Sequence, residues 1–174
     1  GQVIQLDGLD SNFNRVSESI ITSGTTPVQT VKSFMRLNRT YITSGAVNIG
    51  TIRSYYGSSS GPIVGSMAPG NARNKSAVFT IPAGYTAYVL YGDATQFHGG
   101  QGNIGGQIRM YCRMNLDSMP FRNEFTSEVV NGYYRNDFKV PLMLPEKTDI
   151  DVRCVADANN TVFTCNYQIL LNKN

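Results

Sequence analysis

Apolar and polar residues alternate along most of the chain in short stretches, a pattern typical of β-strands with one face on a core. The stretches are rich in β-branched and aromatic residues and are bounded by Gly, Pro, Asn or Ser. No long window shows the period of an amphipathic helix, so the chain is expected to be all-β. The predicted strands are 2–9, 15–22, 33–43, 49–56, 76–82, 86–97, 106–114, 123–130, 137–144, 148–156 and 162–171.

The stretch "RCVADANNTVFTC" at 153–165 places two cysteines around a pair of asparagines. Asparagine tolerates the positive φ that a two-residue hairpin turn requires, so Asn159 and Asn160 suit the tip of such a turn. In that register Cys154 lies opposite Cys165, and one face of the ribbon is almost wholly apolar. We expect an antiparallel hairpin over these two strands.

About eleven strands in a single domain over 1–174 predict two stacked sheets. We expect an antiparallel β-sandwich of jelly-roll or Greek-key type rather than a closed barrel, with the long segment 57–75 crossing between the sheets. The β pattern begins at residue 2 without a preceding turn or cap. The chain is therefore expected to lack residues that precede the first strand.

Charged residues make up only 16% of the chain. A surface so poor in charge indicates cover by neighbouring subunits, although uncharged polar surfaces are also common in extracellular β proteins. The fifteen Lys and Arg are scattered and the net charge is +3, which does not predict a nucleic-acid interface. No stretch is long and apolar enough to predict a membrane span, and no signal segment is recognisable in 1–174.

The three cysteines are interpreted as apolar core residues rather than as reactive groups. Cys154 and Cys165 would form a hydrogen-bonded cross-strand pair, whose geometry we expect to suit a disulfide less well than the neighbouring type. Free thiols are thus favoured over a disulfide. Zinc is less favoured still, because Cys112 stands alone and the single histidine, His98, has no close cysteine partner. No metal or cofactor is expected.

Three sequence patterns partly resemble enzyme sites, but none of them predicts an active site. "GQGNIG" at 100–105 matches a dinucleotide loop in letters but leads into a strand instead of the required helix. A single histidine in a Gly-rich stretch gives no recognisable Ser-His-Asp triad. Carboxylates that recur on one strand face offer a remote glycosidase option. These are Glu124 with Glu128, and Asp149 with Asp151.

Ten tyrosines include two adjacent pairs, Tyr55 with Tyr56 and Tyr133 with Tyr134. Neighbouring residues on a strand point to opposite faces, so each pair is expected to supply one core ring and one surface ring. Sugar platforms are typically built on aromatic faces, tryptophan above all, and this chain has no Trp. The four tyrosines are therefore candidate protein-contact residues, together with the 57–75 segment.

Three stretches carry a family resemblance that covers nearly the whole chain. Their marks are Gly8-Leu9-Asp10 with Phe13-Asn14 and Glu18, the 80–84 turn "TIPAG" with Thr86, and "LPEKTDI" at 144–150. With these marks the chain resembles a family of virion proteins from tailed phages of marine bacteria such as cyanophages. The marks fall on turns and strands, so the resemblance implies a shared sandwich rather than a shared active site. Similar family members usually carry further residues before the "GLD" strand.

The resemblance implies a non-enzymatic structural component of a phage virion, made in the host cytoplasm and acting through assembly contacts. Capsid-decoration, minor-capsid and tail-attached positions are all compatible with it. The expected partners are other virion proteins and further copies of the same chain. The main alternative is a tail or fibre module that recognises the host by binding a surface glycan, and a more distant one is a glycan-cleaving enzyme that uses a carboxylate pair.

Overall fold

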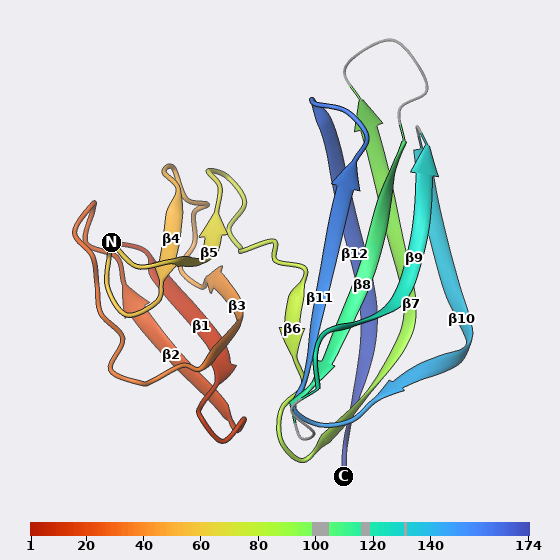
Figure 1. Ribbon diagram of the computed structural model, residues 1–174. Coiled ribbons are helices and arrows are strands. Elements are labelled where there is room, and N and C mark those ends of the chain that lie inside the picture. Colours follow the sequence, from red (N-terminus) through yellow and green to blue (C-terminus); the bar gives the residue numbers. More distant parts are fainter. Residues whose placement is uncertain (99–104, 116–118, 131) are drawn as a thin grey trace. The chain divides into compact units, whose positions relative to one another are not determined.

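The computed structural model describes residues 1–98, 105–115, 119–130 and 132–174, and it confirms the all-β prediction with antiparallel sheets (Figure 1). The described residues form twelve strands. They are β1 (Val3–Leu9), β2 (Arg15–Ile21), β3 (Arg36–Ile42), β4 (Ile52–Tyr55), β5 (Ile63–Met67), β6 (Val78–Thr80), β7 (Tyr85–His98), β8 (Gly105–Met114), β9 (Arg122–Val130), β10 (Gly132–Leu144), β11 (Thr148–Ala156) and β12 (Thr161–Lys173).

Contacts within the chain define two compact units, Gly1–Pro82 and Ala83–Asn174, which we call unit 1 and unit 2. The sequence patterns predict a single domain over 1–174, and that remains a prediction.

Unit 1 is built around β1, which pairs antiparallel with β2 on one side and β3 on the other. Every second residue of β1 faces the interior, so Ile4 is 1% exposed and Leu6 is 6% exposed. Other parts of the unit add their own core residues, among them Met67 on β5 and Ile81, which follows β6. The alternation seen in the sequence therefore corresponds to a real inner face.

Gly8 lies where β1 approaches β3 too closely for a side chain. The register between the two strands shifts between Asp7 and Gly8, the irregularity of a β-bulge. A Cβ atom at Gly8 would lie 2.1 Å from the carbonyl oxygen of Arg36 and 2.8 Å from the Phe34 ring. This glycine is required by the close approach of the backbones.

The residues near the N-terminus that carry the sequence resemblance form turn contacts. The Asp10 carboxylate accepts hydrogen bonds from the backbone amides of Asn12 and Asn14, at 2.8 and 2.9 Å, in the turn between β1 and β2. These bonds lower the pKa of Asp10, the Asn14 amide having the larger effect. The Glu18 carboxylate accepts from the amides of Val31 and Lys32, at 2.9 and 2.8 Å. Each acid thus holds a loop through its backbone N–H groups.

Residues 57–75, which the sequence suggested as a crossing loop, contain a strand instead. β5 lies within this segment and pairs antiparallel with β4. The buried amide of Asn48 anchors the residues after β5, because its Nδ2 donates to the carbonyl of Ala68 at 2.8 Å and its Oδ1 accepts from the amide of Ala72 at 3.1 Å. The prediction failed because "PIVGSM" is short and flanked by Gly and Ser, which weakens a strand signal.

Unit 2 contains two facing sheets, β10-β7-β12 and one in which β8 lies between β11 and β9 (Figure 1). Side chains from both sheets meet in a core centred on Ala94, Ile108 and Val129, which are at most 5% exposed. Tyr134, Val152, Phe163 and Cys165 pack against this cluster. Two sheets that share one core are the arrangement of a β-sandwich.

The hairpin predicted over 153–165 is wrong. β11 pairs with β8 and β12 pairs with β7, so the two strands belong to opposite sheets of unit 2. The turn itself lies where it was predicted, with Asn160 at φ 63°. The alternation of apolar residues is the same whether a strand pairs across its turn or continues into the facing sheet, because both arrangements bury one face. The pattern therefore located the strands but not their partners.

Candidate functional site

The predicted tyrosines lie in both units and differ in exposure. Tyr133 is 61% exposed on β10, whereas Tyr134 points inward and stacks on Phe125 with ring centroids 6.2 Å apart. One surface ring and one interior ring were predicted for this pair, and the structure agrees. In unit 1, Tyr55 is 38% exposed and Tyr56 is 67% exposed, so that pair supplies two surface rings. The difference arises because β4 ends at Tyr55 and the alternation ends with it.

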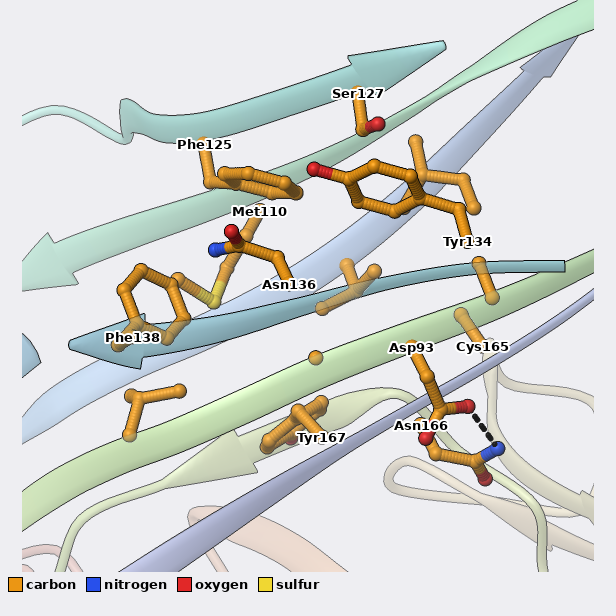
Figure 2. A pocket seen from close by; sticks show the side chains of 15 residues that line it. Asp93, Met110, Phe125, Ser127, Tyr134, Asn136, Phe138, Cys165, Asn166 and Tyr167 are labelled. Atoms are coloured by element: carbon orange, nitrogen blue, oxygen red, sulfur yellow. Dashed lines mark hydrogen bonds between the residues drawn. The ribbon is translucent and has the colours of Figure 1, made fainter. Parts of the chain in front are cut away.

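A small cavity lies between the two sheets of unit 2 (Figure 2). Its labelled wall includes Phe125, Tyr134, Phe138 and Met110, with the Asn136 amide between the aromatic rings. The cavity volume is about 30 Å³. That space is enough for about one or two water molecules and far below the hundreds of Å³ of a typical ligand site. We interpret it as a packing void of the core, not as a binding site.

The outer face of the β10-β7-β12 sheet is a better candidate. Strand register brings its residues into rows that run across the three strands. In one row Arg135, Asp93 and Asn166 lie side by side, and Asn166 Nδ2 donates to Asp93 Oδ1 at 3.0 Å. The next row holds Asp137, Tyr91 and Gln168. These two rows form a polar band across the middle of the sheet.

Arg135 organises this band. Its guanidinium Nη2 donates to Asp137 Oδ1 at 2.7 Å, and its centre lies 4.0 Å from the centroid of the Tyr91 ring. The hydrogen bond from Arg135 lowers the pKa of the Asp137 carboxyl, and the pKa of Arg135 is raised by the same contact. Both side chains of the ion pair are exposed to water, so its role is to orient them rather than to stabilise the fold.

Large apolar side chains lie on either side of the polar band. On the side of the band toward the end of β7, Phe97 is 69% exposed and lies opposite its cross-strand partner Val162, which is 60% exposed. Tyr133 lies on the neighbouring row. On the side of the band toward the start of β7, Met143 is 62% exposed and Leu170 is 57% exposed, and the two lie on either side of Tyr88. We call these residues together with the polar band the outer face of unit 2. The sequence patterns did not single out Phe97, Val162, Tyr91 or Arg135, and Arg135 lies outside the predicted strands.

The carboxylates considered as catalytic pairs have other partners. Asp149 is 3% exposed and its Oδ2 accepts from Arg113 Nη2 at 2.6 Å and from Asn115 Nδ2 at 3.0 Å. Asp151 accepts from Arg153 Nε at 2.7 Å. Each acid is held by its own arginine, which is the arrangement of a structural ion pair rather than of two acids that share a substrate. Glu124 and Glu128 are both exposed on β9.

The remaining chemical candidates give no site in the part of the chain that can be described. No cluster of three or more His, Cys, Asp or Glu side chains there has the arrangement of a metal site. The nucleotide-loop pattern at 100–105 lies outside the described residues except for Gly105, which begins β8. Within the described ranges, no helix reaches the length and apolar character needed to cross a bilayer.

Comparison with known proteins gives no relative: no family model, no curated protein and no solved structure matches this chain.

Proposed function

We propose that the chain is a non-enzymatic structural component of a phage virion, capsid-associated or decorating, that acts through contacts with neighbouring virion proteins or copies of itself. The outer face of unit 2 is the observation that carries the proposal. Its exposed apolar side chains occupy a regular sheet surface, and large surface-exposed apolar groups grouped on one face are typical of interaction sites. The virion assignment rests on the family resemblance of the sequence.

The composition of this face supports assembly. Tyrosine, phenylalanine, methionine and arginine are the residue types enriched at protein interfaces, and tyrosine and arginine are frequent among those that dominate binding energy. Tyr133, Phe97, Met143 and Arg135 all lie here. Asp137 and Tyr91 hold the Arg135 side chain in one position, which reduces the entropy it would lose on binding.

The test is reassembly onto particles made without the protein. The purified chain is added back, and its occupancy is compared with that of a Phe97→Ser, Val162→Ser double variant. Loss of two central apolar contacts is expected to weaken attachment at least about tenfold. The matched control is Val31→Ser with Ile49→Ser, two side chains that are 94% and 96% exposed elsewhere in the chain. The control should attach like the parent chain. Failure of the parent chain to attach, or equal losses in both double variants, would contradict the proposal.

A second candidate, a tail or fibre module that binds a host glycan, is favoured by one feature of the same face. Asp93 and Asn166 offer hydrogen-bonding groups on the row next to the exposed ring of Tyr133, as sugar sites require. The Arg135 guanidinium lies over the Tyr91 ring, which removes that ring as a stacking platform. A glycan-array screen of the whole chain separates the two candidates. Binding that is lost in Tyr133→Ala but retained in Phe97→Ser, Val162→Ser would favour the glycan module.

A further inference from the structure

Cys154 and Cys165 lie near each other across the sandwich of unit 2, as the strand partners of each cysteine indicate. Cys154 on β11 lies beside Ile108 of β8, and Cys165 on β12 lies beside Ala94 of β7. Ile108 and Ala94 belong to the same core cluster between the two sheets. Each cysteine therefore lies one strand away from a core residue, on consecutive strands that belong to opposite sheets (Figure 1). The two thiols lie close enough for each to shift the pKa of the other.

Strand alternation places both cysteines on the faces of their strands that carry core residues, near the end of the sandwich where Cys154 is exposed. Cys154 follows Ile150 and Val152 on the inward face of β11. Cys165 follows Phe163 on the inward face of β12 and lines the cavity (Figure 2). The turn at 157–160 connects the two strands directly. The sheets are held close at this end, since a Cβ atom on Gly106 would lie 2.4 Å from the ring of Phe163 on the opposite sheet.

The two thiols also remain accessible. Cys154 is exposed and Cys165 is half-buried, and both are free thiols. The third cysteine differs, because Cys112 is only 2% exposed and its burial raises its pKa to about 12. Small oxidants in solution can therefore reach the first two thiols but not the third.

We propose that Cys154 and Cys165 are a dithiol site that closes to an intersheet disulfide by exchange with a low-molecular-weight disulfide. The Cys165 thiolate attacks one sulfur of the small disulfide, forms a mixed disulfide and releases one small thiol. Cys154 then loses its proton and attacks Cys165 Sγ, which displaces the second small thiol. The protein gives two electrons and two protons, and the small disulfide becomes two thiols. The inference does not depend on the assembly role.

Electrostatics favour Cys165 as the attacking thiolate. Interaction with the Cys154 thiol lowers the pKa of Cys165, against the opposing effects of burial and of the Asp93 charge. The pKa of Cys154 is raised by the same interaction and by burial. A lowered pKa increases the thiolate fraction, and the thiolate is the form that attacks a disulfide.

The experiment compares folded and denatured protein. The whole chain is equilibrated over a series of ratios of glutathione to glutathione disulfide, quenched in acid, and analysed by mass after alkylation of the remaining thiols. In the folded chain we expect one intramolecular bond between Cys154 and Cys165, with Cys112 alkylated. The effective concentration of the thiol pair should be at least about tenfold higher than in the same chain in guanidinium chloride, because the fold keeps the two thiols near each other. The oxidised form should melt about 5–10 °C above the reduced form.

Two variants assign the bond. Cys112→Ser should leave the equilibrium unchanged, and Cys154→Ser should stop the reaction at a mixed disulfide with glutathione. An effective concentration no higher in the folded chain than in guanidinium chloride would overturn the proposal. A bond that involves Cys112, or dimers linked between chains, would overturn it as well. The comparison of folded and denatured parent chain needs no variant, so it decides the question even where a variant does not fold.

Discussion

Individual residues of this chain act mainly through the backbone groups that they approach. Gly8 leaves room for the carbonyl of Arg36, and Asp10 and Glu18 accept hydrogen bonds from loop amides. All three are among the residues on which the sequence resemblance rests. Their common role is to fix turns and a bulge, which is consistent with the expectation that the resemblance concerns fold rather than catalysis.

Gly8→Ala is expected to destabilise the protein by about 2–3 kcal/mol, because a methyl group 2.1 Å from the Arg36 carbonyl oxygen forces the backbones of β1 and β3 apart. The matched control is Gly50→Ala, a position where an added Cβ meets nothing within 4 Å. The control should change the free energy of unfolding by less than about 1 kcal/mol. Urea unfolding measures both variants. Equal losses in the two would show that the contact at Gly8 has no special role.

The Asp7 carboxylate makes the free energy of unfolding depend on pH in the acid range. Burial opposes ionisation of its carboxyl, but hydrogen bonds from Ser17, Gln5 and Arg39 outweigh that effect and hold the pKa below 3.8. A lowered pKa gives stability that is fully present above the unfolded-state value and is lost as the pH falls through the folded-state value. Asp7→Asn should therefore cost roughly 0.5–1 kcal/mol at pH 7, and the difference from the parent should shrink in unfolding measurements below about pH 4. A difference that stays constant down to pH 2 would contradict this.

The strands were predicted well and their pairing was not, and both outcomes have a physical reason. Alternation identified β7, β8, β11 and β12 almost to the residue, since each buries one face. The partner of a strand depends on contacts distant in sequence, so no local pattern identifies β7 as the neighbour of β12. The outer face of unit 2 was missed for the same reason. Phe97, Arg135 and Val162 form one surface only because three strands from distant parts of the chain pair in one register.

The turn between β11 and β12 offers a test at the scale of one element. Asn160 has φ 63°, in the left-handed region, whereas Asn159 is not among the residues with positive φ. Asn160→Ala should lower the free energy of unfolding by about 1 kcal/mol, because alanine tolerates this region less well than asparagine. Asn159→Ala is the control and should have less than half that effect. Chemical unfolding that shows equal effects would argue that the backbone at Asn160 is not constrained.

At the scale of the molecule, each compact unit has its own buried residues. The central core of unit 2 consists of Ala94, Ile108 and Val129 with packing partners that all follow residue 83. The predicted single domain and the two compact units imply different behaviour when the chain is divided. A unit with a complete core of its own can fold alone.

The fragment 83–174 is expected to fold by itself and to retain the β-type circular dichroism of the parent chain, with a cooperative thermal transition. Its control is the same fragment with Ile108→Asp, which places a charge in the core and should abolish the transition. A fragment that is unfolded at low temperature would show that unit 2 depends on residues 1–82, and would favour the single-domain prediction.

The pairing of β7 with β12 has a consequence for synthesis on the ribosome. β7 spans Tyr85–His98, yet its partner β12 spans Thr161–Lys173, and Thr86 hydrogen-bonds to Asn174, 88 positions later, at 2.7 Å. Until the intervening residues and β12 have been made, β7, the central strand of the β10-β7-β12 sheet, lacks its neighbour β12. Closing so long a loop is also entropically costly, which slows folding. The sandwich of unit 2 therefore forms only after β12 has left the exit tunnel, and nascent chains that stall before this point expose an open, aggregation-prone strand edge.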